Sequence, residues 1–264
     1  MEKNALIGFS GFVGSTLLKQ ARFDALYRST NVHEIENQAF DVVVCAGAPA
    51  QKWIANRDPA DDLKKIDTLI GHLQTIRCKT FVLISTVDVF KHPVGVNEAT
   101  AVEEAGLHPY GLHRRRLEKF VQNHFSCHLI VRLPGLVGPG LRKNVVFDFL
   151  NNNLQAIEGR GVFQFYPTVN LWYDIQLALK NSLELVHLTA DPISVADVSL
   201  QGFGRSFTQT LSNAPASYDM QTQYAGLFGS GGHYQTSARE TIQAIRAYAQ
   251  SEPVTLKPAA GAAP

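Results

Sequence analysis

The feature that most constrains the fold is a set of short apolar runs separated by segments with helical spacing. The runs are continuous rather than alternating and rich in β-branched residues, which is typical of strands buried on both faces of a sheet. Between them, apolar residues from Leu63 to Ile76 recur at the spacing of one helix face. Strands that alternate with helices form parallel sheets through right-handed crossovers, so the pattern predicts a doubly wound α/β fold. The expected strands are Ala5–Ile7, Asp24–Tyr27, Val42–Cys45, Phe81–Ile84 and Leu129–Val131.

The overall composition narrows the classes of partner. The chain has 264 residues, of which 45% are hydrophobic and 18% are charged, the balance of an ordinary globular protein. Its formal net charge is +1, so no overall field attracts nucleic acid or an anionic membrane. No apolar run approaches the roughly 20 residues that cross a bilayer, and the N-terminus lacks the segments of a secretory signal. We therefore expect a cytoplasmic protein with a small-molecule partner, not a nucleic-acid or membrane partner.

A glycine motif directly follows the first apolar run. Gly8, Gly11 and Gly14 stand in the segment GFSGFVG, at the start of a predicted helix that runs to Gln20. Glycines at such a turn let backbone N–H groups approach a pyrophosphate and let the helix pack closely on the strand. The alternative is a glycine-rich turn without a ligand, which the strand–helix context disfavours. The motif predicts a dinucleotide site formed by Gly8, Ser10, Gly11, Phe12, Val13 and Gly14.

The end of the second predicted strand bears on the identity of the cofactor. A site for NAD normally has Asp or Glu there, whose carboxylate binds the ribose hydroxyls. This sequence instead has Arg28, Ser29 and Thr30 after Tyr27. A cation and hydroxyls suit a 2′-phosphate, so Arg28 favours NADP over NAD. The alternative, an arginine on a solvated loop, stays open at this point.

Five motifs in order resemble the extended short-chain dehydrogenase/reductase family, which includes sugar-nucleotide epimerases, dehydratases and 4-keto reductases. The likeness covers roughly residues 4–200 and begins with the glycine motif in its GxxGxxG spacing. The other motifs are the segments DVVVCAG (41–47), STVDVF (85–90), PYGLHR (109–114) and RLPGLVGPG (132–140). The resemblance implies a Rossmann-type sheet and NAD or NADP as cofactor. It also implies further cofactor contacts from Ala46, Gly47, Ala48, Ser85, Pro134 and Leu136.

The same resemblance implies which residues carry the chemistry. The family's hydroxyl residue falls on Thr86, counting back from Phe90, and its tyrosine is Tyr110. A threonine at a strand end and a tyrosine on a neighbouring helix can both hydrogen-bond one carbonyl or alcohol oxygen. Hydride would then pass between the nicotinamide and the adjacent carbon. The resemblance thus implies an oxidoreductase or epimerase that acts on a sugar nucleotide or a similar small molecule.

The main departure from the family lies at its basic residue. The family pattern is YxxxK, whereas this sequence has Arg114 four residues after Tyr110. Positions i and i+4 share a helix face, so Arg114 can still bring positive charge to the tyrosine. A guanidinium is nevertheless not equivalent to an ammonium at a geometrically specified site. We expect Arg114 to be the third catalytic residue and a cofactor contact. The alternative is a dinucleotide-binding sensor or regulator with weak or no catalysis.

The substrate site is predicted from two short segments. Asp88 stands where dehydratases carry an adjacent Asp-Glu pair, but only one carboxylate is present, which favours reduction or epimerisation over dehydration. Farther along, Arg142, Lys143 and Asn144 could bind a diphosphate or a sugar. The alternative for this run is a solvated basic loop. No His, Cys, Asp or Glu cluster has the spacing of metal ligands, so no metal is expected.

The chain is predicted to divide near residue 140. Residues 1–140 are expected to form the Rossmann domain, its sheet completed by parts of 165–200, and residues 141–257 a small C-terminal substrate-binding lobe. Helices are expected at 171–185 and 238–249, a loop at 212–235, and a disordered tail at 258–264. The expected helix at 60–77 and the helix that carries Tyr110 resemble a pair that joins two subunits in many family members, which implies a homodimer.

Overall fold

The computed structural model describes residues 3–254, and the tail predicted at 258–264 lies outside the described residues. Its largest element is a six-stranded sheet in the order β10-β6-β4-β3-β1-β2, with every pairing parallel. The predicted doubly wound α/β fold is therefore confirmed. The strands are β1 (Asn4–Ile7), β2 (Ala25–Tyr27), β3 (Ala39–Cys45), β4 (Arg77–Thr86), β6 (His128–Leu133) and β10 (Leu185–His187).

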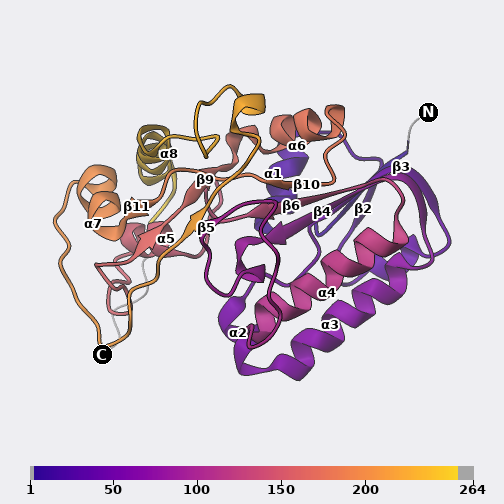
Figure 1. Cartoon of the computed structure of the whole chain (residues 1–264), viewed down its shortest axis with the longest axis horizontal. Coiled ribbons are helices and arrows are strands. Elements are labelled where there is room, and N and C mark those ends of the chain that lie inside the picture. Colours follow the sequence, from indigo (N-terminus) through magenta and orange to yellow (C-terminus); the bar gives the residue numbers. More distant parts are fainter. Residues whose placement is uncertain (1–2, 255–264) are drawn as a thin grey trace, which may run out of the picture.

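Helices cover both faces of this sheet (Figure 1). The helices α3 (Pro59–Leu73) and α4 (Pro109–His124) lie on one face, and α1 (Phe12–Gln20) and α6 (Leu171–Lys180) lie on the other. In β1, Ala5 and Ile7 pack into the core shared with α3 and α4, whereas Leu6 packs into the core shared with α1 and α6. Both faces of each central strand are buried, which explains why the strands are continuous apolar runs in the sequence.

Local capping fixes where the two helices beside the site begin. The carboxylate of Asp58 accepts a hydrogen bond of 3.1 Å from the backbone N–H of Asp61, at the start of α3. At the start of α4, Nδ1 of His108 accepts a hydrogen bond of 3.0 Å from the backbone N–H of Gly111. Each helix also has proline in its first turn, a position that costs no hydrogen bond. This start places Tyr110 in the first turn of α4.

Two predicted helices are longer than the observed ones. The helix expected at 60–77 ends at Leu73 because β4 begins at Arg77. The helix expected at 171–185 ends at Lys180 because Leu185 begins β10. Ile76 lies in the turn just before β4, and Leu185 belongs to β10. A short apolar run fits a helix end or a strand start equally well.

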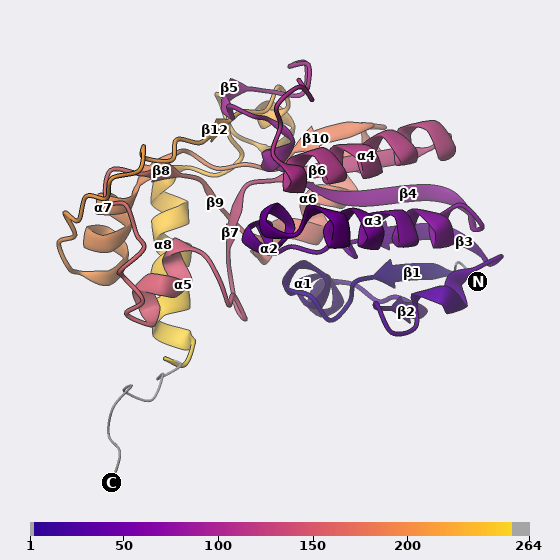
Figure 2. The same cartoon turned by 90° about the horizontal axis from the view of Figure 1, so that it is seen from below.

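Elements that follow β6, other than α6 and β10, form a smaller group beside the sheet together with β5 (Figure 2). Three two-stranded pairs join β5 with β12, β7 with β9, and β8 with β11, so a strand lies inside the loop predicted at 212–235. The helix α8 begins at a capping box between Ser237 and Glu240. Among residues 3–254, no helix is both long enough and apolar enough to cross a membrane. The remaining elements are α2 (Lys52–Arg57), β5 (Val94–Val96), β7 (Gly135–Val137), α5 (Val145–Leu150), β8 (Val162–Phe163), β9 (Phe165–Pro167), β11 (Ile193–Ser194), α7 (Val195–Asp197), β12 (Asp219–Met220) and α8 (Ala238–Ser251).

Candidate active site

Two glycines of the first motif are required by backbone packing. Gly8 has a φ of +85°, and a Cβ on it would lie 2.3 Å from the carbonyl oxygen of Ala46. A Cβ on Gly14 would lie 2.1 Å from the carbonyl oxygen of Gly8. Both contacts are with backbone atoms, which cannot move aside as a side chain can. Gly8 and Gly14 therefore allow the turn after β1 to pack against α1 and against the segment that follows β3.

Gly11 has a different environment. It is the N-cap of α1 with a φ of −77°, which any residue can adopt, and a Cβ on it would have Gly8 O at 3.4 Å as its only neighbour within 4 Å. The fold therefore does not require a glycine at position 11. A ligand that approaches the backbone closely would require one, because a side chain would stand in its way. The first turn of α1 carries no acidic side chain, and the N–H groups of a first helical turn have no partner within the helix. This cradle fits a pyrophosphate.

The residues after β2 lie beside the glycine turn. The guanidinium carbon of Arg28 is 5.9 Å from the centre of the Phe9 ring, and its Nε donates a hydrogen bond of 3.0 Å to the hydroxyl of Thr30. The backbone N–H of Gly8 donates to the carbonyl oxygen of Tyr27 at 2.7 Å, which fixes the two segments together. Arg28 and Ser29 are exposed, so an exposed cation stands next to the cradle.

The other predicted cofactor contacts lie at the carboxyl ends of strands. Ala46, Gly47 and Ala48 directly follow β3, and the backbone N–H of Ala46 donates to the carbonyl oxygen of Ile7 at 2.9 Å. Pro134 follows β6 and is buried, and Leu136 lies in β7 and is half-buried. Because the strands are parallel, their carboxyl ends lie at one edge of the sheet, together with the glycine turn.

Ser85 has a structural partner. Its hydroxyl donates a hydrogen bond of 2.6 Å to the carboxylate of Glu118, which also receives hydrogen bonds from Arg132 at 2.9 and 2.7 Å and from Arg115 at 2.9 Å. Burial raises the pKa of Glu118, but the hydrogen bonds and charge of Arg132 hold it below its usual range. This buried group ties the end of β4 to α4 and β6, so the Ser85 side chain is engaged inside the protein.

The structure brings Thr86 and Tyr110 together. Thr86 ends β4, Tyr110 lies in the first turn of α4, and the Thr86 side chain lies beside the phenol, whose pKa it lowers. The hydroxyl of Thr86 accepts a further hydrogen bond of 3.1 Å from the backbone N–H of Asp88. The backbone N–H of Tyr110 donates to Oδ1 of Asn56 at 3.0 Å, which holds this turn of α4 against α2. Tyr110 is only 8% exposed.

The charges around Tyr110 have opposing effects on its phenol. Burial raises the pKa of Tyr110, the Arg114 guanidinium lowers it, Asp88 raises it, and Thr86 and Lys52 lower it. The pKa stays above its ordinary value. The phenol is therefore protonated at neutral pH and can donate its proton to a substrate oxygen.

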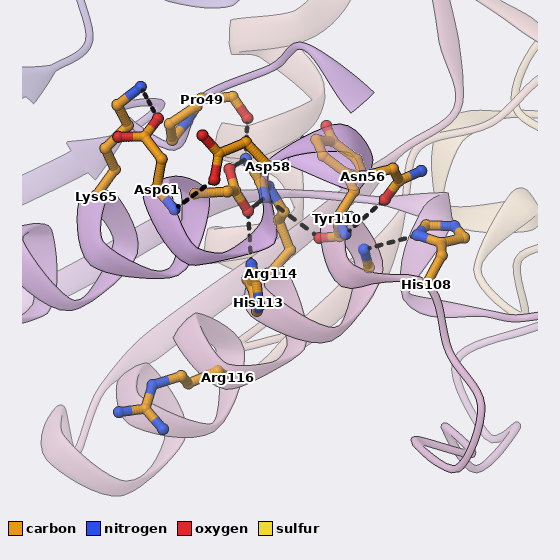
Figure 3. Close-up of polar contacts among 12 residues, drawn as sticks. Pro49, Asn56, Asp58, Asp61, Lys65, His108, Tyr110, His113, Arg114 and Arg116 are labelled. Carbon is orange, nitrogen blue, oxygen red and sulfur yellow. Dashed lines mark hydrogen bonds and ion pairs between the residues drawn. The ribbon is translucent and has the colours of Figure 1, made fainter. Parts of the chain in front are cut away.

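Arg114 lies over the ring face of Tyr110 instead of at its hydroxyl (Figure 3). Its guanidinium carbon is 4.0 Å from the ring centre, and the residue is only 3% exposed. It donates to both carboxylate oxygens of Asp62, at 2.5 and 2.9 Å, and to the carbonyl oxygens of Pro49 and Tyr110. His113 makes a 2.7 Å contact with the same carboxylate. Arg114 is thus fixed between α3, α4 and the segment after β3.

The predicted substrate run 142–144 divides into different roles. Oδ1 of Asn144 accepts hydrogen bonds from the backbone N–H groups of Val146 at 2.9 Å and Phe147 at 3.3 Å, so this side chain caps α5. Lys143 reaches across to the first half of the chain, where its Nζ donates to the carbonyl oxygen of Ala50. Arg142 is exposed. Lys143 is therefore the member of the run that the structure brings to the loop after β3.

Two residues of the site were not predicted from the sequence. Nζ of Lys52 lies 2.6 Å from Oδ1 of Asp88 and 3.3 Å from the hydroxyl of Tyr218, which is itself 3.3 Å from the same carboxylate oxygen. Lys52 starts α2, and Tyr218 comes from the segment predicted as loop. Neither stands in a motif, so the sequence carried no signal for them. Within the described part of the chain, no group of three or more His, Cys, Asp or Glu residues is placed to hold a metal ion.

Comparison with known proteins gives matches among solved structures only. Neither a protein-family model nor a curated protein matches the sequence. A dTDP-4-dehydrorhamnose reductase from Bacillus anthracis, solved with NADP, is 15% identical, with a TM-score of 0.70 over 95% of this chain and 98% of that chain. A UDP-glucose 4-epimerase from Thermotoga maritima, solved with UDP-glucose, is 16% identical, with a TM-score of 0.69 over 94% of this chain and 98% of that chain.

A third solved structure is an NAD-dependent NDP-hexosamine 5,6-dehydratase involved in tunicamycin biosynthesis. It is 16% identical, with a TM-score of 0.73 over 96% of this chain and 99% of that chain. Identities this low show a common fold, and both chains match over nearly their whole length. The chain therefore has the fold of these reductases, epimerases and dehydratases, as its resemblance to the extended short-chain family implied.

Proposed function

We propose that this protein is an NAD(P)-dependent oxidoreductase or epimerase of the extended short-chain dehydrogenase/reductase family. The observation that carries the proposal is the common location of two features. The glycine cradle follows β1, and the Thr86–Tyr110 pair stands at the end of β4 and the start of α4. Both lie at the carboxyl edge of the parallel sheet, where open α/β sheets bind their ligands.

The dinucleotide would be held by the cradle and the strand ends. The N–H groups of the first turn of α1, with Gly11 leaving room beside them, suit the pyrophosphate. Arg28 stands where the adenosine ribose is expected, and residues 28–30 include no carboxylate to bind its hydroxyls or to repel a 2′-phosphate. The proposal is therefore NADP in preference to NAD.

The chemistry would use Thr86 and Tyr110 on one substrate oxygen. When bound, the nicotinamide supplies a hydride to a carbonyl carbon or accepts one from an alcohol carbon. Tyr110 donates its proton to the carbonyl oxygen as the hydride reaches the carbon, so the carbonyl becomes a hydroxyl. The Thr86 hydroxyl accepts from the Asp88 N–H, so its own hydrogen can turn from the phenol beside it to the same substrate oxygen when substrate binds.

The proposed substrate is a sugar nucleotide or a similar small molecule. The reductase, epimerase and dehydratase that share this fold are named for nucleotide-linked sugars. Residues 141–257 are proposed to form the substrate-binding lobe beside the domain of residues 1–140. Lys143, which reaches from the lobe to the carbonyl oxygen of Ala50, supports this location for an anionic substrate group. Asp88 has Val87 beside it in place of a second carboxylate, which favours reduction or epimerisation over dehydration.

The test combines binding with turnover. NADH or NADPH consumption is followed with a panel of nucleotide-linked keto and hydroxy sugars, with UDP-glucose in the panel. We expect Tyr110→Phe to lower turnover by about 100-fold or more, while dinucleotide affinity stays within about twofold. Tyr173→Phe, which alters an exposed tyrosine of α6, is the matched control. Unchanged turnover in Tyr110→Phe would remove this residue from the mechanism, and dinucleotide binding without turnover of any panel member would favour the sensor or regulator.

A homodimer and a cytoplasmic location complete the proposal. The helices α3 and α4 pack side by side on one face of the sheet, and Arg116 and Asp67 form a 2.7 Å ion pair between them. This helix pair is proposed as the contact between two subunits. Sedimentation at micromolar concentration should show a species of twice the chain mass, and a monomer alone would contradict the dimer.

A further inference from the structure

Three polar side chains from separate segments meet beside Thr86. Lys52 comes from the start of α2, Asp88 from the turn after β4, and Tyr218 from the segment before β12. The Lys52 ammonium lies 2.6 Å from the Asp88 carboxylate and 3.3 Å from the Tyr218 hydroxyl. The ammonium is therefore held in one place by two partners that belong to different halves of the chain.

The contacts connect this group with the hydroxyl end of Tyr110. The phenol lies beside the Thr86 hydroxyl, which accepts a hydrogen bond of 3.1 Å from the backbone N–H of Asp88. The backbone N–H of Tyr110 donates to Asn56 of α2, the helix that carries Lys52. The side chain of the same Asp88 binds Lys52. A continuous series of contacts thus runs from the phenol oxygen through Thr86 and Asp88 to the Lys52 ammonium.

Arg114 approaches the same tyrosine from another side. Its guanidinium lies over the ring face at 4.0 Å, and its N–H groups point to Asp62 and to the carbonyl oxygens of Pro49 and Tyr110. A buried arginine held by a buried carboxylate on two oxygens cannot turn toward the phenol without leaving that carboxylate unpaired. The side chain of Lys52, in contrast, is 39% exposed, and its ammonium is held by Asp88 and Tyr218.

We propose that Lys52 is the positioning residue that holds a positive charge at the hydroxyl end of Tyr110, and that Asp88 and Tyr218 keep it there. Arg114 lowers the pKa of the same phenol from the ring face, where Asp62 holds it. The inference rests on the proposed function in one respect, the use of Tyr110 as the proton donor. It adds to the charge of Arg114 a second positive charge, that of Lys52, which no motif identified.

The charged and titratable groups that face Tyr110 come from four segments. They are Arg114 on α4, Asp88 after β4, Lys52 on α2, and His108, whose ring centre is 6.3 Å from that of the tyrosine. Burial and the nearby Lys52 lower the pKa of His108, so the imidazole is neutral at pH 7. Asp88 raises the pKa of Tyr110 and Lys52 lowers it, so the two effects oppose each other while the ion pair is intact.

The experiment measures the pKa of Tyr110 itself, with no substrate or cofactor present. The protein is labelled with ¹³Cζ-tyrosine and titrated by NMR, and the Tyr110 signal is assigned as the one missing in Tyr110→Phe. Asp88→Asn should lower the pKa of Tyr110 by about one unit, because the change removes a negative charge and keeps an oxygen that, with Tyr218, holds Lys52 in place. Adding Lys52→Met to Asp88→Asn should raise the pKa again by about one unit.

Two matched variants complete the design. Lys52→Arg in the Asp88→Asn background should keep the lowered pKa, because it keeps the charge. Lys65→Met in the same background should also leave it unchanged, because Lys65 is an exposed lysine of α3 paired with Asp61. Thermal unfolding of each variant verifies that the fold is retained.

The result that would overturn the proposal is an equal pKa of Tyr110 in Asp88→Asn with and without Lys52→Met. This outcome is independent of the proposed function, because the titration requires no turnover. Conversely, Tyr110→Phe with full turnover would refute the role of Tyr110 as proton donor even if Lys52 controls its pKa.

Discussion

The two kinds of glycine in the first motif lead to opposite predictions. Gly14→Ala places a Cβ 2.1 Å from the carbonyl oxygen of Gly8 and 2.7 Å from its carbonyl carbon. Forcing an atom into a closely packed site costs about 1–3 kcal/mol and occasionally more, and the gain in helix propensity from glycine to alanine is about 1 kcal/mol. Because both clashing atoms belong to the backbone, we expect the upper end of this cost and a net loss of about 2 kcal/mol in the free energy of unfolding.

Gly11→Asp should leave the fold intact and abolish the ligand site. Position 11 is the N-cap of α1 and has room for a side chain. Because aspartate is a preferred N-cap residue, the free energy of unfolding should change by less than about 0.5 kcal/mol. A carboxylate about 6 Å from one phosphate charge costs about 3 kcal/mol at an effective dielectric constant of about 20. Dinucleotide affinity should therefore fall by about 100-fold or more.

The assays are guanidinium unfolding, which gives the free energy of each variant, and titration with NADH and NADPH followed by nicotinamide fluorescence. Gly14→Ala should lose stability, whereas Gly11→Asp should lose binding at wild-type stability. If Gly11→Asp binds either dinucleotide as tightly as the wild-type protein, the cradle is not the pyrophosphate site. If Gly14→Ala is as stable as the wild type, the steric argument for this turn is wrong.

Three further predictions follow from other parts of the structure. Arg114→Lys replaces a guanidinium that binds both oxygens of the buried Asp62 by a single ammonium. The free energy of unfolding should therefore fall by about 2 kcal/mol. An unchanged midpoint of thermal unfolding would contradict the fixed position of Arg114. Burial raises the pKa of Asp174, which accepts a hydrogen bond from Tyr166, to about 6. Since its unfolded pKa is about 3.9, the folded protein binds this proton more tightly, and about 3 kcal/mol of stability present below pH 4 is lost as the pH rises through 6. In Asp174→Asn, the free energy of unfolding should therefore fall less steeply as the pH rises across this range. An unaltered pH profile would refute the raised pKa of Asp174. Arg28→Ala should weaken NADPH binding by about tenfold and leave NADH within about twofold, and equal losses for both would contradict a contact with the 2′-phosphate.

The fold class follows from local patterns in the sequence. Continuous apolar runs predict strands buried on both faces, and the glycine motif stands directly after the first of them. The family resemblance identified Thr86 and Tyr110, and each lies at an element boundary, one at the end of β4 and the other in the first turn of α4. In a parallel sheet such boundaries lie at one edge, so local patterns are enough to bring these residues together.

The charged environment of Tyr110, in contrast, depends on how distant segments pack against each other. Arg114 is spaced correctly to reach Tyr110, but its guanidinium is directed by Asp62, a residue 52 positions earlier on the adjacent α3. Lys52 and Tyr218 are 166 positions apart and meet only because the second half of the chain folds back over the edge of the sheet. Periodicity and motifs indicate which residues share a strand or a helix face. They do not indicate which charges meet between two elements, because this depends on how the elements pack and so on side chains throughout the core.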